Sequence, residues 1–134
     1  MVVLDEGEEV MEALKRLAQV EDLGASRFTA IGAFSRATLG YFEIDEKAYR
    51  RIPVVEQTEV LALVGDVTRH EGEVQVHAHV VLGTRDGTTR GGHLLEARVR
   101  PTLEVMLEEA PGTIQRRLDP RFGIPLIQVD EPSR

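Results

Sequence analysis

One helical pattern followed by a long series of strand-like runs is the feature of this sequence that most restricts its fold. In "EGEEVMEALKRLAQVEDLG", residues 6–24, apolar side chains recur three and four residues apart and predict an amphipathic helix through Val10, Met11, Leu14, Leu17 and Ala18. Asp5 is placed to cap this helix, and Gly24 to end it just past Leu23. The acidic first turn, Glu8 and Glu9, suits the positive end of the helix dipole, an interpretation we favour over a docking face for a basic partner.

After the helix, short runs rich in Val, Ile, Leu, Phe and Tyr are separated by Gly, Asp and Glu, a pattern typical of strands joined by tight turns. The expected strands cover residues 28–34, 38–44, 52–55, 60–67, 74–82, 93–99, 103–107 and 126–129. Ser35 is expected in a turn between the first two strands, Pro101 at a strand start or bulge, and residues 109–125 in a surface loop rich in Pro and Gly. The predicted fold class is α+β, a largely antiparallel β-sheet with one main N-terminal helix packed on it, because a doubly wound parallel sheet would need more helices.

Size and composition indicate one domain spanning residues 1–134, since a chain with 42% hydrophobic and 29% charged residues at this length forms one ordinary globular core. The sequence has no cysteine, no apolar run of bilayer length, and no basic start followed by the apolar stretch of a secretory signal. We therefore expect a cytoplasmic protein without a membrane partner. The formal net charge of −7 repels phosphate backbones and weighs against nucleic acid as a partner.

Three of the four histidines fall within "VQVHAHVVLGTRDGTTRGGHLLE", residues 74–96. Polar and apolar side chains alternate in its first part, so His77 and His79 share one face of a strand while the apolar side chains share the other. The Cβ atoms of the two histidines are expected roughly 6–7 Å apart, close enough for both imidazoles to converge on one metal ion. Two ligands alone make a weak site, so the position of His93 decides whether a metal can bind.

The turn before His93 has two alternative forms. A two-residue Asp-Gly loop would place residue 80 opposite His93, on the apolar side of the sheet. A three-residue loop, "RDG", closed by Gly87 in the left-handed region as a G1 bulge, would pair residue 84 with residue 88 and place His79 opposite His93. Glycine at the third loop position favours the second form, although Gly91 and Gly92 could interrupt the ladder or admit a close backbone or ligand.

Three histidines without cysteine favour Zn²⁺, with Ni²⁺, Cu²⁺ or Fe²⁺ as alternatives, and they leave one position open for water or a ligand. The competing interpretation is that His77, His79 and His93 are ordinary polar residues on an exposed sheet face. His70 belongs to a turn and is expected in a surface loop.

Other chemistry-bearing residues are weaker candidates. Arg85, Arg90, Gly91 and Gly92 form a candidate contact for an anionic ligand, although solvated hairpin arginines are the commoner case. Glu96 is a poor general base, because three residues along a strand place it on the opposite face from His93. Ser35 lacks the motif of a serine nucleophile, and we interpret it as a turn residue.

The segments "IGAFSRATLGYFE", "TEVLALVGDVTRHEGEVQVHAHVVLG" and "GGHLLEARVRPTLEVMLEE" resemble the prokaryotic single-domain branch of the plant and prokaryote conserved (PPC) domain. The resemblance extends from Gly7 to about residue 126, and its most specific part is HxHxxLG followed by GGHL, here His77, His79, Leu82, Gly83 and residues 91–94. It implies an antiparallel sheet flanked by a helix, a homotrimer, and a metal, zinc before others, on His77, His79 and His93.

The predicted function is a metal-binding homotrimeric module with a binding or regulatory role, and a small molecule is the expected ligand at the open metal position. The family also suggests a DNA-binding regulatory protein, but its plant members carry a basic AT-hook that this sequence lacks. With 16 basic against 23 acidic residues, a cationic surface would depend on scattered arginines, namely Arg85, Arg90, Arg98 and Arg100. A metal-dependent hydrolase or lyase is the second alternative, and we expect binding more than catalysis because no general base can be named.

Overall fold

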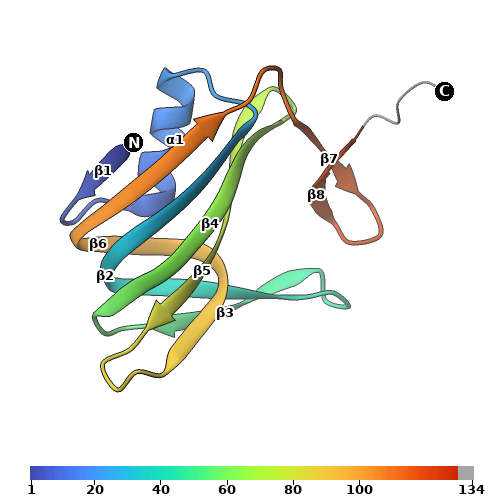
Figure 1. Cartoon of the computed structure of the whole chain (residues 1–134). Coiled ribbons are helices and arrows are strands. Elements are labelled where there is room, and N and C mark those ends of the chain that lie inside the picture. The colour runs from blue at the N-terminus through green and yellow to red at the C-terminus, as the bar shows by residue number, and fades with distance from the viewer. Residues whose placement is uncertain (130–134) are drawn as a thin grey trace.

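The computed structural model describes residues 1–129, and within them one helix accompanies a strongly curved, mostly antiparallel sheet (Figure 1). The elements are β1 Val2–Asp5, α1 Val10–Val20, β2 Ser26–Glu43, β3 Ala48–Val54, β4 Thr58–His70, β5 Glu73–Gly83, β6 Thr89–Glu109, β7 Gln115–Asp119 and β8 Ile124–Ile127. The α+β prediction is confirmed. No helix in this part of the chain has the length and hydrophobicity that crossing a membrane requires.

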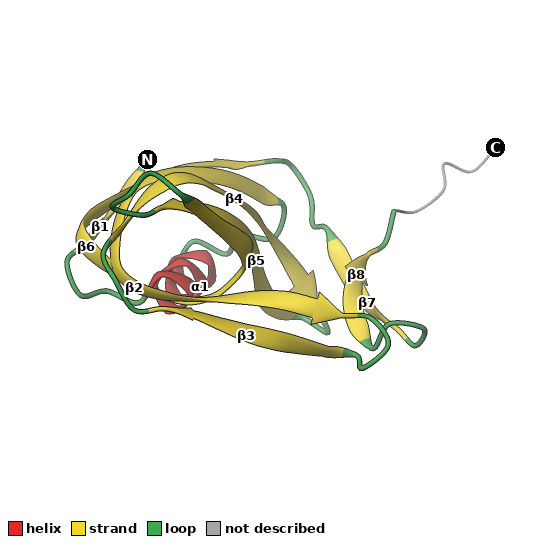
Figure 2. Cartoon of the chain, turned by 90° about the horizontal axis from the view of Figure 1, so that it is seen from below, coloured by secondary structure: helices red, strands yellow, loops and turns green. Residues whose placement is uncertain are grey.

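The sheet closes on itself because β2 pairs with three strands. Its first half lies between β4 and the end of β6, and its second half lies between the start of β6 and β3. Since β5 joins β4 to β6, the strands β2, β6, β5 and β4 form a ring. Figure 2 looks into this ring, with α1 visible inside its outline.

The prediction of separate strands at 28–34 and 38–44 is wrong, because both belong to the continuous β2, and Ser35 lies within it. Register shifts between Gly32 and Phe34 and between Phe34 and Arg36 bend the strand while its pairing continues. Gly32 has a φ of 151°, and a Cβ there would collide with the carbonyl oxygen of Thr102 on β6. Strands 93–99 and 103–107 are likewise one strand, β6. A bulge thus replaces the turn expected at Ser35, and a bulge, one of the two expectations at Pro101, is present between Val99 and Leu103.

Helix α1 begins and ends differently from its prediction. Asp5 is the last residue of β1, and Glu9 is the N-cap, with its carboxylate accepting from the backbone N–H of Glu12 at 2.7 Å. The helix ends at Val20, earlier than Gly24, whose N–H donates to the side chain of Glu109 at 2.9 Å. The side chains of α1 that are buried against the sheet are Val10, Ala13, Leu14 and Ala18. The helical stripe itself was predicted correctly.

The hydrophobic core fills the ring and the space beneath α1. Its largest fully buried side chains are Phe34, Leu14, Leu39, Leu63, Leu82, Leu94 and Leu103. Each such side chain contributes roughly 1.5–3 kcal/mol relative to an exposed one. The ring is therefore a rigid support for whatever its outer face carries.

Residues 109–125, expected as a loop, contain the strand β7 and the start of β8, which form a hairpin (β7–β8 in Figure 1). The expected strand 126–129 is β8, which begins earlier, at Ile124, and ends at Ile127. Pro125 is tolerated because β8 is an edge strand. Only two parallel backbone pairs, Arg69 with Gln115 and His70 with Arg116, join this hairpin to β4 within the described residues. The hairpin is thus an appendage of the ring.

Candidate metal centre

The β5–β6 turn sets the position of His93. Thr84 and Thr88 pair through a 2.9 Å backbone hydrogen bond, and Gly87 has a φ of 82°. These are the features of the three-residue turn, and His79 stands directly opposite His93 as that turn predicts. Asp86 stabilises the turn: hydrogen bonds from the Thr84 hydroxyl, then from Thr88, lower the pKa of its carboxyl to about 2.

Gly91 and Gly92 pair regularly with β5, so they leave the ladder intact. A Cβ on Gly92 would lie 2.9 Å from the carbonyl oxygen of Gly40 on β2. Of the two roles that the sequence left open, close backbone approach is therefore the one that the structure supports. His93 then projects to the same face as His77 and His79.

The three histidines form a compact cluster. One ring nitrogen from each of His77, His79 and His93 lies within 4.8 Å of the others. The His77 and His93 rings are stacked with centroids 5.1 Å apart, while the His79 ring is nearly perpendicular to both. Nitrogens around a tetrahedral zinc lie roughly 3.4 Å apart, so small side-chain rotations would complete such a site.

A charged pair behind the cluster orients His77. Asp66 on β4 lies 3.3 Å from Nδ1 of His77, and its other carboxylate oxygen accepts from the Arg116 guanidinium at 2.8 Å. Burial alone would raise the pKa of Asp66, but hydrogen bonds from His77 and Arg116 hold it below its ordinary value. An ionised carboxylate only accepts, so the contact with Asp66 favours a proton on Nδ1 of His77 and leaves Nε2 for a metal; the Arg116 guanidinium lies 3.4 Å from the same Nδ1.

Arg116 on β7 is the most buried charged group at the site, with 8% of its side chain exposed. Besides Asp66, its guanidinium donates to the Thr68 hydroxyl at 2.8 Å and to the Pro125 carbonyl at 3.2 Å. The Nδ1–H of His70 donates to the Arg116 carbonyl at 2.9 Å. His70 is thus the last residue of β4 and part of the hairpin attachment, which corrects its prediction as a loop residue.

His79 and His93 are held in the neutral form that a metal requires. Burial, then the neighbouring charges of His77, His79 and Arg116, lowers the pKa of His93 to about 4. Burial and then His77 also lower the pKa of His79. Nδ1 of His93 is buried and lacks a hydrogen-bond partner among residues 1–129. An orphaned buried polar atom costs about 1–3 kcal/mol, which a coordinated ion would offset. The donor set therefore fits a divalent transition metal.

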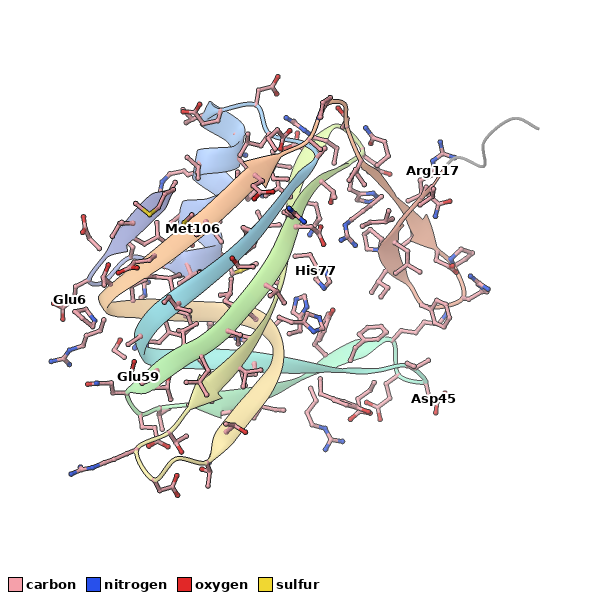
Figure 3. The ribbon with its side chains drawn as sticks, in the orientation of Figure 1. Glu6, Asp45, Glu59, His77, Met106 and Arg117 are labelled. Carbon is pink, nitrogen blue, oxygen red and sulfur yellow. The ribbon has the colours of Figure 1, made fainter. Side chains whose placement is uncertain are left out.

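The cluster opens into a pocket of about 340 Å³. The lining is made of Phe42 and Tyr49 from β2 and β3, Gln75, Val76, His77 and His79 from β5, His93 from β6, and Arg116, Ile124, Pro125 and Leu126 from the hairpin. The ring of Tyr49 stacks on that of His93 with centroids 4.7 Å apart. In Figure 3, His77 lies between the β2–β3 tip, marked by Asp45, and the β7–β8 hairpin, marked by Arg117.

The remaining predicted residues lie elsewhere. Arg85 and Arg90 line a separate open depression beside the β5–β6 turn, away from the histidine pocket. Glu96 accepts from the Thr38 hydroxyl at 2.8 Å and from Arg51 at 2.9 Å. Ser35 donates only weakly, at 3.4 Å, to a backbone carbonyl on β6.

Sequence reasoning missed Asp66, Arg116 and the aromatic Tyr49. Asp66 carried a usable signal, since it is a charged residue inside an otherwise apolar strand. Arg116 carried none, because it stands beside Arg117 in a segment that resembles a loop. Tyr49 reaches the site only through the pairing of β3 with β2, which no local pattern reveals.

Comparisons with known proteins add to this geometry. The model of the Plants and Prokaryotes Conserved (PCC) domain, the domain also written PPC, matches residues 1–111. A plant- and prokaryote-conserved protein from Pyrococcus horikoshii is 32% identical, with a TM-score of 0.91 over 98% of this chain and 91% of that one. A metal-containing protein from Archaeoglobus fulgidus is 29% identical, with a TM-score of 0.86 over 96% of this chain and 91% of that one.

A protein from Ralstonia eutropha JMP134 whose name proposes DNA binding is 26% identical, with a TM-score of 0.89 over 96% of this chain and 89% of that one. No curated protein sequence matches the chain significantly. The names of these two similar proteins thus differ, since one mentions a metal and the other DNA binding.

Proposed function

We propose that this chain, which belongs to the Plants and Prokaryotes Conserved domain family, binds one divalent metal ion, zinc before others, through His77, His79 and His93. The observation that carries the proposal is the convergence of three imidazole nitrogens within 4.8 Å on one face of β5 and β6. Three neutral nitrogen ligands suit zinc, and they leave a coordination position open toward the pocket. The chain then acts as a binding or regulatory module whose ligand occupies that position.

The surroundings of the cluster support this assignment. Asp66 accepts from His77, as outer carboxylates do for metal-ligating histidines in general. A bound zinc would supply Lewis acidity at the open position. The chain's own part is to orient His77 through Asp66 and to keep His79 and His93 unprotonated.

We also propose that the module is a homotrimer, as the family resemblance implies. Large apolar side chains that are between 41% and 59% exposed gather on neighbouring strands of the outer face, namely Ile31, Leu61, Val64, Val81 and Met106. Val64 pairs with His79 across β4 and β5, and Met106, labelled in Figure 3, pairs with Thr29 on β2. Association of subunits would cover this apolar face.

DNA binding is the weaker alternative. It relies on the name of the Ralstonia relative and on arginines that are scattered over the chain. Arg98 donates to the Gly7 carbonyl and Arg100 pairs with Glu6, so both are engaged within the subunit. Hydrolase or lyase chemistry would need a base near the ion, and Glu96 is engaged with Thr38 and Arg51 instead.

The test is metal content per subunit by plasma mass spectrometry, together with native mass by light scattering on the same tag-free sample. We expect about one zinc per subunit and three times the mass of one chain. His79→Ala should lose stoichiometric metal, because two histidines alone bind weakly. Glu73→Ala, at the exposed start of the same strand and outside both the pocket and the proposed subunit interface, is the matched control and should keep its metal.

Metal retained by His79→Ala at one ion per subunit would reject the site. A monomeric mass with full metal content would reject only the trimer.

A further inference from the structure

Two hairpins from distant parts of the chain meet beyond the histidine cluster. The β2–β3 hairpin and the β7–β8 hairpin both extend from the ring on the side of His77 (Figures 1 and 3). Their tips touch: the Lys47 ammonium donates to the Pro120 carbonyl at 3.0 Å. The pocket between them is therefore walled on two sides by elements that the ring itself does not need.

The two walls differ in chemistry from the floor. Phe42 and Tyr49 face the pocket from the β2–β3 hairpin, and Ile124, Pro125 and Leu126 face it from the other. Phe42 and Tyr49 are themselves in contact, with ring centroids 5.0 Å apart. A ligand between these walls gains most from a flat or apolar body that can stack on Tyr49.

The floor carries the Arg116 guanidinium, whose charge is paired with the Asp66 carboxylate behind it, so a net positive charge comes from the metal ion on the histidines. Arg116 lines the pocket, and its guanidinium engages Thr68, Asp66 and Pro125 and lies 3.4 Å from Nδ1 of His77, which leaves one N–H of Nη1 without a partner in these contacts. Among the residues that the structure describes, the lining includes no carboxylate, although the chain as a whole has a net charge of −7. With a divalent ion on the histidines, the floor attracts an anionic head group.

We infer that this pocket binds a small carboxylic acid with a planar apolar body, with its carboxylate on the open metal position beside Arg116 and its body between Tyr49 and the β8 residues. The inference rests on the proposed function, since the metal provides half of the head-group site. A carboxylate suits both partners: it coordinates zinc through oxygen, and it accepts hydrogen bonds from a guanidinium. The volume of about 340 Å³ is at the small end of the range for ligand sites, which limits the acid to one ring or a short branched chain.

The experiment is isothermal titration calorimetry on zinc-loaded protein with benzoate as the probe. Acetate serves as the probe without a ring and benzamide as the probe without a charge. We expect benzoate to bind at least tenfold more tightly than acetate, benzamide to give no measurable binding, and removal of zinc to weaken benzoate at least tenfold.

Tyr49→Ala should weaken benzoate binding by about 2- to 10-fold, the usual contribution of an aromatic contact. Tyr41→Ala is the matched control, since Tyr41 lies on the same hairpin, is 62% exposed and does not line the pocket. The metal content of every sample is measured alongside. A sample that takes up no metal contradicts the proposed function itself.

Full metal content without benzoate binding overturns the pocket assignment alone. Equal binding of acetate and benzoate, or equal losses in Tyr41→Ala and Tyr49→Ala, overturns the role of the aromatic wall. Unchanged benzoate binding after zinc removal overturns the placement of the carboxylate on the metal.

Discussion

The ring of strands and the β7–β8 hairpin both contribute to the histidine pocket, but they are built differently. The ring has continuous backbone ladders and a core whose largest side chains, such as Leu63 and Leu94, are 0% exposed. The hairpin joins β4 by two backbone pairs and by the polar contacts of one buried arginine, Arg116. The PCC domain match ends at residue 111, before the hairpin begins.

This difference separates two tasks. The three histidines come from β5 and β6 of the ring, where the register determines their positions. The β8 wall of the pocket comes from the hairpin, which two backbone pairs and the contacts of Arg116 attach to β4. A rigid scaffold thus holds the metal ligands, while a weakly attached element shapes what can reach them.

The largest expected effect is the difference in stability lost when a leucine is truncated in the ring and in the hairpin. Leu63→Ala in the ring should cost about 2–5 kcal/mol, because it leaves a cavity in a closed core. Leu118→Ala on β7, where the side chain is 60% exposed, should change stability by less than about 0.5 kcal/mol. Urea unfolding measures both free energies. Comparable losses in the two variants would show that the hairpin shares the core of the ring.

A second effect is the pH dependence of the stability of the metal-free protein. The pKa of His93 is lowered to about 4, first by burial, against about 6.5 in an unfolded chain. Between these pH values the unfolded chain binds more protons than the folded one. The contribution of His93 to the free energy of unfolding is therefore full above pH 6.5 and is lost as the pH drops toward 4.

Urea unfolding of metal-free protein at pH 7 and pH 4 tests this expectation. The decrease should be about 1–3 kcal/mol smaller in His93→Gln than in the unchanged chain, because glutamine does not titrate. Equal losses of unfolding free energy in the two proteins would contradict the lowered pKa of His93 and show that the ring and its hairpin do not bury this side chain.

The smallest effect concerns the contact between the hairpin tips. Lys47→Ala removes the hydrogen bond to the Pro120 carbonyl, which is exposed, so overall stability should change by less than about 0.5 kcal/mol. Amide hydrogen exchange should quicken a few-fold in β7 and β8 and remain unchanged in β4 and β5. Lys15→Ala, on the exposed face of α1, is the control. Faster exchange throughout the ring would contradict the separation of the two regions.

Local chemistry made part of this structure predictable. Glycine at the third position of the β5–β6 turn set the register that places His79 opposite His93, and the apolar stripe of α1 identified the helix. The length of β2 was not predictable in the same way. Its bends lie at bulges, whose polar residues, such as Ser35, resemble a turn when read one at a time.

The second half of the site depends on pairing between distant segments. Arg116 meets Asp66 only because β7 runs parallel to β4, and two backbone pairs create that arrangement. A prediction from local patterns sees a loop with two arginines and cannot distinguish the buried one from Arg117. Contacts of this kind are determined by tertiary structure alone.

The central position of β2 also dictates the order in which the protein can fold. Its first residue, Ser26, pairs with Val67 on one side and with Glu109 on the other. A chain emerging from a ribosome therefore cannot close the ring until the segment around residue 109 has been synthesised. Until then, the edge of β2 that pairs with β6 stays unpaired. Ordering so many residues before distant pairs form is slow, so we expect refolding on the scale of milliseconds to seconds.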